Sequence, residues 1–383
     1  MSENNIGIYV HIPFCVKKCI YCDFCSFSDT DEKVKSVYFE TLMREARSLS
    51  GYMKKNGITA DTAFIGGGTP SSVDYAYITD ILKEISAGRM AEVSVEVNPG
   101  TVTGDMLEAY VNAGVTRLSI GAQSFDDSEL KFLGRIHSAS QTEEAFRMAR
   151  EAGIANINID LIFGFPGQSI ESWKESLQRT IKLVPEHISF YSLQIEEGTR
   201  LYDLFRSEKI AAVSDELNRG MYHCAHEMLR AHGYHHYEIS NAAQPGFECA
   251  HNLKYWRMEP YIGIGLAAHS CLNNSRFSNP EDLGDYEMYM DHIGVDDDFM
   301  LGRDVQESSD QDYISDFFFT GLRLTDGISI SRFEEKTGIN FREKYRDVLY
   351  KHLKDGLLAV EADKLRFTEK GLDVANSVII DFI

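Results

Sequence analysis

The sequence is poor in basic side chains. Its 383 residues include 38 lysines and arginines against 59 aspartates and glutamates, a net charge of −21. A surface this acidic repels phosphate backbones and anionic membranes, so we expect neither nucleic acid nor a membrane surface as a partner. No run approaches the roughly 18 apolar residues of a membrane span. The N-terminus also lacks the basic flank and apolar stretch of a signal peptide. These absences predict a cytoplasmic protein.

Cysteine is scarce but concentrated near the N-terminus. The chain has seven cysteines, and an odd number without an export signal argues against a disulfide framework. Four of them, Cys15, Cys19, Cys22 and Cys25, lie close together. Neighbouring thiols in a reducing compartment usually share a metal. We therefore expect a metal centre in this segment.

Six short β-branched runs alternate with apolar residues at helical spacing in the first half of the chain. The runs are 8–12, 62–65, 93–97, 117–120, 157–162 and 187–191. Such alternation predicts a parallel sheet built from βα units. Most of these runs end in polar or glycine-rich segments, and in βα barrels the active site lies at those strand ends. We expect an α/β fold with a partial (β/α)6 barrel, in preference to a doubly wound open sheet.

The remainder of the chain is less regular. We assign residues 1–240 to the barrel, 241–300 to an irregular linking region and 301–383 to a small C-terminal helical domain. Residues 281–304 carry nine carboxylates and one arginine, and this composition predicts a solvated linker.

The C-terminal segment shows helical patterns followed by a hairpin. The helices are expected near 313–324, 328–337 and 345–353, and the hairpin strands at 358–360 and 365–367. This order resembles a winged helix. The segment holds more acidic than basic residues, so we expect a packing or interaction module and not a DNA reader.

The cysteines Cys15, Cys19 and Cys22 form a C-x3-C-x2-C pattern on the loop after the first predicted strand. Three thiolates can hold a cubane iron–sulfur cluster and leave one iron free for another ligand. Structural zinc requires four protein ligands. Cys25 could supply the fourth, so zinc stays open as the alternative on spacing alone.

The run from Tyr9 to Cys22, YVHIPFCVKKCIYC, resembles the radical S-adenosylmethionine (SAM) superfamily. Within it, the sequence is similar to the oxygen-independent coproporphyrinogen oxidase-like branch through most of its length. The resemblance implies that Cys15, Cys19 and Cys22 hold a [4Fe–4S] cluster whose fourth iron binds SAM. It also implies an electron donor, because reductive cleavage of SAM gives a 5′-deoxyadenosyl radical.

Further residues at the predicted strand ends match the SAM contacts of that branch. They are Tyr9, Gly67, Gly68, Thr69, Glu96, Gln123, Arg135 and Asp160. Glycines allow close approach of a ligand to the backbone, a carboxylate can accept from ribose hydroxyls, and an arginine can pair with the SAM carboxylate. Each has an ordinary structural explanation alone, but their joint order along the strands predicts a SAM site.

Within this branch the resemblance implies one of two activities. One is oxidative decarboxylation of coproporphyrinogen III in haem synthesis, and the other is transfer of haem to an acceptor protein by a haem chaperone. Phe24 stands where the oxidases have an additional cysteine, and only fourteen residues precede Cys15. The run 251–256, HNLKYW, matches an H-N-x-x-Y-W motif of the chaperones. These features favour the chaperone; a radical enzyme with another substrate stays open.

The same resemblance implicates His251 in haem binding. Imidazole is a common axial ligand of haem iron, and the neighbouring Tyr255 and Trp256 offer flat apolar faces. The alternative is that His251 is a hydrogen-bonded core residue. Gln194 stands where the oxidases contact a second SAM, which puts a second SAM in doubt.

Overall fold

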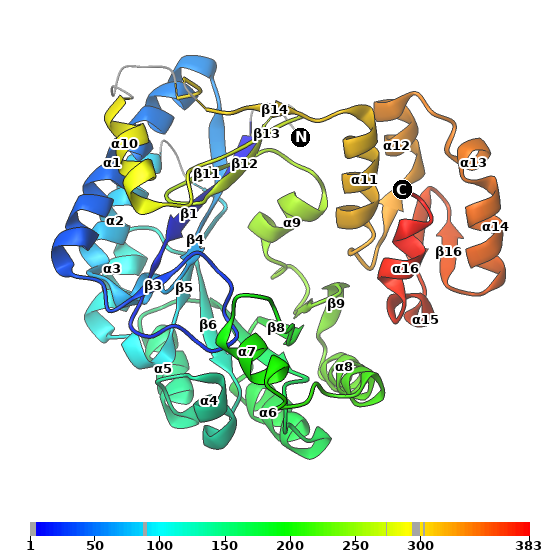
Figure 1. Cartoon of the computed structure of the whole chain (residues 1–383), viewed down its shortest axis with the longest axis horizontal. Helices are drawn as coiled ribbons and strands as arrows, with labels where there is room; N and C mark the ends of the chain where they lie inside the picture. Colours follow the sequence, from blue (N-terminus) through cyan, green and yellow to red (C-terminus); the bar gives the residue numbers. More distant parts are fainter. Residues whose placement is uncertain (1–4, 87–89, 273, 293–298, 302) are drawn as a thin grey trace.

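The computed structural model describes residues 5–86, 90–272, 274–292, 299–301 and 303–383. A twelve-stranded sheet organises most of the chain (Figure 1). Its strands follow the order β14 (Gln306–Glu307), β13 (Ser275–Ser278), β12 (His269–Leu272), β11 (Tyr261–Ile264), β1 (Asn5–Ile12), β4 (Thr59–Gly67), β5 (Glu92–Val97), β6 (Arg117–Gln123), β7 (Asn156–Phe163), β8 (His187–Ser192), β10 (Asn241–Ala243) and β9 (His235–Glu238).

The six predicted strands are confirmed, and they lie side by side in chain order from β1 to β8 with parallel pairing throughout. Sequential order without a reversal distinguishes a barrel from a doubly wound sheet. Within the described residues the two outer strands, β14 and β9, do not pair with each other. The sheet is therefore a partial barrel, as expected.

Helices connect these strands and cover the outside of the sheet (Figure 1). They are α1 (Glu32–Asn56), α2 (Tyr75–Ile85), α3 (Gly104–Asn112), α4 (Asp127–Leu133), α5 (Ala139–Glu151) and α6 (Ile170–Leu183), followed after β8 by α7 (Arg200–Arg206) and α8 (Asp215–Ala231). The longest of them, α1, starts after the N-cap Asp31 and ends at Gly57, which has the left-handed φ of +64° that suits glycine. None of the described helices is long and apolar enough to cross a membrane.

The interior of the barrel carries a polar network. Asn158 on β7 donates to Ser119 on β6 at 2.7 Å and is hydrogen-bonded to His187 on β8 at 2.6 Å. Ser119 in turn donates to Asp160 at 2.8 Å. Because alternate side chains of a strand point to opposite faces, the apolar side chains on the same strands pack under the helices. A polar interior suits a barrel that accepts a ligand from one end.

The region 241–300 is more regular than predicted. Its strands β10 to β13 extend the main sheet at both edges, and β11 pairs with β1 in parallel. It also contains α9 (Ala250–Trp256) and α10 (Leu283–His292).

The prediction of a solvated linker at 281–304 is wrong for residues 281–292, 299–301, 303 and 304; the rest of that range lies outside the described residues. Tyr286, Met290 and Phe299 are buried in the main core. Arg303 forms an ion pair with Glu45 of α1 at 2.7 Å, and both side chains are buried. The count of carboxylates was misleading because apolar residues between them form a buried face.

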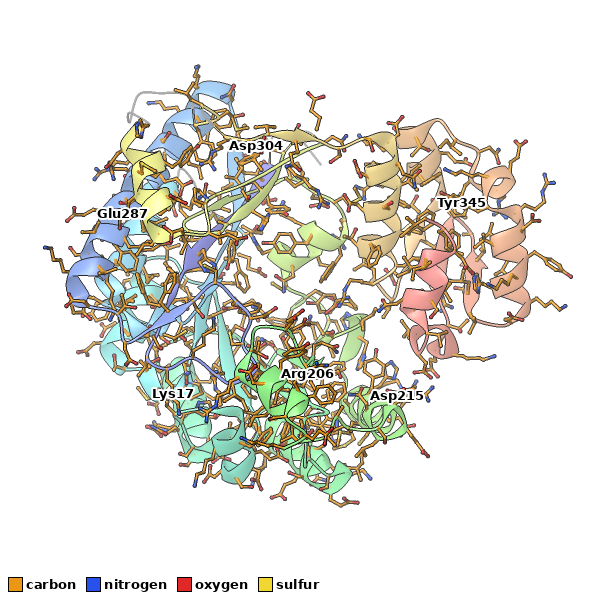
Figure 2. All side chains as sticks on the ribbon, in the orientation of Figure 1. Lys17, Arg206, Asp215, Glu287, Asp304 and Tyr345 are labelled. Atoms are coloured by element: carbon orange, nitrogen blue, oxygen red, sulfur yellow. The ribbon has the colours of Figure 1, made fainter. Side chains whose placement is uncertain are left out.

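The C-terminal segment forms a small helical domain with its own apolar core. Its elements are α11 (Asp310–Gly321), β15 (Ile328–Ser329), α12 (Ile330–Thr337), α13 (Phe341–Lys344), α14 (Arg346–Lys354), β16 (Leu358–Glu361), β17 (Lys364–Phe367), α15 (Glu369–Leu372) and α16 (Ala375–Ile380). The predicted hairpin is confirmed as β16 and β17, which β15 extends to three strands. Figure 2 labels Tyr345, which packs among Phe318, Phe333 and Phe341 in this core.

Candidate functional site

A cavity of about 450 Å³ lies at the carboxyl ends of the barrel strands. This volume falls within the range of small-molecule sites. Most of the predicted site residues line it, namely Cys15, Cys19, Cys22, Gly67, Gly68, Thr69, Glu96, Gln123, Arg135 and Asp160. Tyr9 and His251 are not among the lining residues. The fold thus brings together predicted residues from four strands, the loops that follow them and the cysteine loop.

The cysteine loop leaves β1 through β2 (Phe14–Cys15) and returns at β3 (Phe27–Ser28), which pair with each other. The Cys15 thiol accepts from the Thr69 hydroxyl at 3.5 Å, and Cys19 accepts from Arg135 at 3.4 Å. The Cys25 thiol instead donates to the carbonyl oxygen of Glu281 at 3.7 Å and does not line the cavity. Three thiols therefore face the cavity and a fourth is engaged elsewhere.

This donor set fits the cluster that the resemblance implies. Across the described residues, no group of three or more histidine, cysteine, aspartate or glutamate side chains is placed to hold a single metal ion. Burial raises the pKa of the Cys15 and Cys22 thiols, so the charge of a bound metal would be needed to keep them as thiolates. Three thiols around one cavity suit a cluster that keeps one position open.

The glycine turn after β4 lies between the cysteine loop and Glu96. The backbone N–H of Gly67, whose φ is +109°, donates to Glu96 at 3.2 Å. A Cβ atom at Gly68 would lie 3.0 Å from the Cys15 sulfur and 2.7 Å from the carbonyl oxygen of Phe14. The turn can therefore pass this close to the cysteine loop only because residue 68 is a glycine and has no side chain.

Glu96 is held in a buried position that disfavours its charge. Burial, and secondly the negative charge of Asp160, raise the pKa of Glu96 to about 8. A carboxyl group that is protonated near neutral pH can donate a hydrogen bond as well as accept one. Glu96 can thus accept a hydrogen bond from a ligand hydroxyl group or donate one to its oxygen.

Arg135 has one buried donor without a partner. It donates to the carbonyl oxygen of Gly121 at 2.7 Å, but its Nε has no hydrogen-bond acceptor among the described residues. Since a buried unsatisfied donor is costly, a ligand carboxylate at this wall of the cavity would stabilise it. Nearby, Gln123 has a φ of +66°, a strained conformation for a residue other than glycine that is frequent at functional sites.

Tyr9 lies deeper in the barrel than the cavity lining. Its hydroxyl is hydrogen-bonded to Nδ1 of His11 at 2.9 Å, and its ring stacks on Phe64. The other ring nitrogen of His11 is 2.8 Å from the carbonyl oxygen of Cys25. His11 therefore connects Tyr9 to the end of the cysteine loop, a role that sequence reasoning missed.

Several other lining residues were missed. Lys17, Lys18, Ser119 and Tyr191 also line the cavity. For Ser119, alternation along β6 was the available signal, because it shares a strand face with the predicted residue Gln123. Tyr191 had no predicted site residue on its strand. The lysines adjoin the cysteines, and spacing alone did not single them out.

His251 lies at the opposite end of the barrel from the cavity mouth. Its helix α9 packs against the amino-terminal ends of the strands, where Glu92 of β5 accepts the backbone N–H of His251 at 3.1 Å. The side chain is fully buried, and its nitrogens are hydrogen-bonded to Thr62 at 2.9 Å and to Tyr255 at 2.8 Å. Burial, and secondly the charge of Lys254, lower the pKa of His251 to about 3, so the imidazole is neutral.

Trp256, at the end of α9, meets the C-terminal domain. The guanidinium of Arg323 lies 4.6 Å from the centre of its indole ring. The motif residues His251 and Trp256 therefore contact different parts of the molecule.

Comparison with known proteins identifies the family. Residues 9–180 match the radical SAM superfamily, and residues 309–374 match the HemN C-terminal domain. The haem chaperone HemW of Bacillus subtilis is 34% identical over 380 residues, which cover 98% of each chain. HemW of Escherichia coli K12 is 34% identical over 393 residues, which cover 99% of this chain and 98% of its own.

Among solved structures, coproporphyrinogen III oxidase (HemN) from Escherichia coli superposes with a TM-score of 0.83. At 23% identity, over 99% of this chain and 90% of that chain, it shows the shared fold. The HemW relatives match this chain along its whole length at 34% identity. The chain therefore belongs to the HemW family of the radical SAM superfamily.

Proposed function

We propose that this protein is a haem chaperone that binds haem and transfers it to an acceptor protein, and that it holds a [4Fe–4S] cluster with SAM. The full-length similarity to HemW proteins carries this proposal. Phe24, at the position where the oxidases have an additional cysteine, favours it over coproporphyrinogen decarboxylation. The Phe24 ring is 61% exposed beside the cavity.

The cavity residues have distinct roles in this proposal. Cys15, Cys19 and Cys22 bind the cluster, which together with SAM supplies one-electron chemistry when bound. Arg135 pairs with the SAM carboxylate through its unpartnered Nε. Glu96 and Asp160 bind ribose hydroxyls.

The backbone of the glycine turn and Gln123 shape the other side of the SAM site. Gly67 and Gly68 allow the ligand to approach the main chain, and Thr69 orients Cys15 through the hydrogen bond between their side chains. Tyr9 is hydrogen-bonded to His11, and His11 positions the end of the cysteine loop through the carbonyl oxygen of Cys25.

His251 is the proposed axial ligand of haem iron. In the structure both of its ring nitrogens are hydrogen-bonded and the ring is buried. Coordination therefore requires His251 to release Thr62 or Tyr255, and α9 to move away from the barrel. Haem binding at this residue is coupled to local opening.

Two partners belong to the proposal. Haem transfer requires an acceptor protein, and reduction of the cluster requires an electron donor. None of the seven cysteines forms a disulfide bond in the structure, which fits the reducing conditions of the cytoplasm.

Anaerobic reconstitution followed by two assays tests the proposal. Titration with haemin should give a Soret band, which His251→Ala should weaken. Incubation with coproporphyrinogen III, SAM and a reductant should yield no protoporphyrinogen IX. Robust decarboxylation without haem binding would overturn the chaperone assignment in favour of the oxidase.

A further inference from the structure

A connected network of hydrogen bonds runs through the barrel beneath the cavity at the cysteine loop and ends at Asp160. Its side chains are those of Tyr237 on β9, His187 on β8, Asn158 and Asp160 on β7, and Ser119 on β6. We call these five side chains the Asp160 network. Ser119 and Asp160 line the cavity, whereas Tyr237, His187 and Asn158 are buried beneath it. The network therefore connects the cavity to the interior of the barrel.

Both carboxylate oxygens of Asp160 accept a hydrogen bond from this network. Oδ1 accepts from the side-chain amide of Asn158 at 2.7 Å, and Oδ2 accepts from the Ser119 hydroxyl at 2.8 Å. The amide of Asn158 donates its second hydrogen to Ser119 at 2.7 Å. Because a charged carboxylate can only accept, these contacts fix which end of the Asn158 amide is the nitrogen. Together the two donors hold the carboxylate of Asp160 in one orientation.

The amide oxygen of Asn158 is held from the opposite side. It accepts from the Ser189 hydroxyl at 3.2 Å and lies 2.6 Å from Nδ1 of His187. An amide oxygen can only accept, so Nδ1 of His187 carries a hydrogen. The two donors and the oxygen of Asn158 are then all engaged, and the orientation of its amide depends on that hydrogen of His187.

His187 is held in this tautomer by Tyr237. Burial, and secondly the charge of Arg117, lower the pKa of His187, so the ring is neutral and carries one hydrogen. Nε2, which lies 2.8 Å from the Tyr237 hydroxyl, therefore accepts. The Tyr237 oxygen accepts the backbone N–H of Cys249 at 3.4 Å, which leaves its own hydrogen for His187. Each hydrogen bond from Cys249 to Asp160 thus has a single direction.

We propose that His187 is a positioning residue for SAM binding: through Asn158 it holds the carboxylate of Asp160 ready to accept hydrogen bonds from the ribose hydroxyls. The inference rests on the SAM site proposed above. A buried polar network whose members are all satisfied fixes one arrangement of its side chains. The two carboxylate oxygens have lone pairs beyond those used by Asn158 and Ser119, so Asp160 can accept from a ligand without breaking the network.

His187→Asn and His187→Gln separate this role from a general role in folding. The amide nitrogen of asparagine lies close to the place of Nδ1, whereas that of glutamine reaches the place of Nε2. Asparagine should therefore keep the bond to Asn158, and glutamine should lose it. Equilibrium dialysis of SAM against the anaerobically reconstituted protein, without a reductant, measures the affinity. It should fall by about tenfold or more in His187→Gln, the scale of a hydrogen bond to a charged group, and by less than about threefold in His187→Asn.

A double-mutant cycle with Asp160→Ala tests whether His187 acts through Asp160. The two side chains share no direct hydrogen bond, and Asn158 bonds to both. In the Asp160→Ala background, His187→Gln should therefore cause no further loss of SAM affinity. His352→Gln is the matched control. His352 is a buried histidine of the C-terminal domain, bonded to Asp381 at 2.7 Å, and its substitution should leave SAM affinity unchanged.

A measurement on the wild-type protein covers the case in which the His187 variants do not fold. Nitrogen NMR of histidine-labelled protein should show His187 as the Nδ1–H tautomer, with its signal assigned by the change in Tyr237→Phe. An Nε2–H tautomer would overturn the proposal.

The affinities distinguish the remaining outcomes. Equal SAM affinity in the wild type and His187→Gln would overturn the positioning role and leave the SAM site in place. An equal loss with and without Asp160 would do the same, because the effect would then not pass through that carboxylate. If the wild-type protein bound no SAM at all, the SAM site and the positioning role would both fall.

Discussion

His251 and Tyr255, one turn apart on α9, are joined by a hydrogen bond of 2.8 Å between Nε2 and the phenolic oxygen. The second ring nitrogen is engaged by Thr62. A histidine in this state cannot ligate iron until one of these bonds breaks, so the structure represents a closed form with respect to that ligand.

Tyr255→Phe should therefore accelerate haem association at His251. The substitution removes a hydrogen bond whose net contribution is about 1 kcal/mol, which corresponds to roughly a fivefold change in rate. Stopped-flow absorbance in the Soret region measures it. Tyr261→Phe is the control, because the ring of Tyr261 packs on Tyr255 but does not contact His251 through its hydroxyl. Equal rates in all three proteins would show that this bond does not limit binding.

The four clustered cysteines should differ in their effect on the cluster. Cys15→Ser, Cys19→Ser and Cys22→Ser should each abolish the iron–sulfur absorbance after anaerobic reconstitution. Cys25→Ser should retain most of it, since the Cys25 thiol faces Glu281 outside the cavity. Iron content and visible absorbance provide the measurement. A loss in Cys25→Ser as large as in the other three would contradict the three-ligand assignment.

The stability of the cluster-free protein should decrease with pH through Glu96. Its folded-state pKa of about 8 lies above the ordinary value of 4.5, so the folded state holds the proton more tightly. Its contribution is present below pH 4.5 and is lost as the pH rises through 8. Glu96→Gln should therefore gain stability relative to the wild type between pH 5 and pH 8, by on the order of a few kcal/mol.

Urea denaturation at several pH values across this window measures the effect. Asp105→Asn, a substitution of an exposed carboxylate on α3, serves as the control and should follow the wild type. Parallel stability curves for the wild type and Glu96→Gln would contradict a raised pKa.

Removing one partner of the buried ion pair between Glu45 and Arg303 should strongly destabilise the fold. Arg303→Ala leaves the fully buried Glu45 without its cation, which should lower the free energy of unfolding by about 3–5 kcal/mol. Arg44→Ala breaks an ion pair between α1 and Asp291 of α10, whose side chains are much more exposed to solvent, and it should cost less than about 1 kcal/mol. Similar losses in both variants, measured by chemical denaturation, would refute the distinction.

The barrel was predictable from sequence because each of its strands carries a local signal. β-branched runs and helical spacing alternate, and the residues with unusual chemistry follow the strands. Glu96, Gln123 and Asp160 could thus be assigned to one cavity before their distances were known. The carboxyl ends of parallel strands lie at one end of a barrel, so residues that follow different strands meet there.

The features that were missed depend on partners distant in sequence. Tyr286 and Arg303 lie in an acidic segment, and only their contacts with Glu45 reveal that it folds against α1. His11 bonds to a backbone carbonyl, which no residue type can signal. The burial of His251 follows from how α9 inserts under the barrel. A motif identifies such a residue but not its accessibility.

The pairing of β11 with β1 has a consequence for synthesis of the chain. Strand β4, one neighbour of β1, is made soon after it, but the other neighbour, β11, follows only after roughly 250 further residues. At ribosomal rates of about 5–20 residues per second, these take about 10–50 s. During that interval one edge of the strand that leads into the cysteine loop is unpaired. The barrel therefore stays open along this edge until β11 is made.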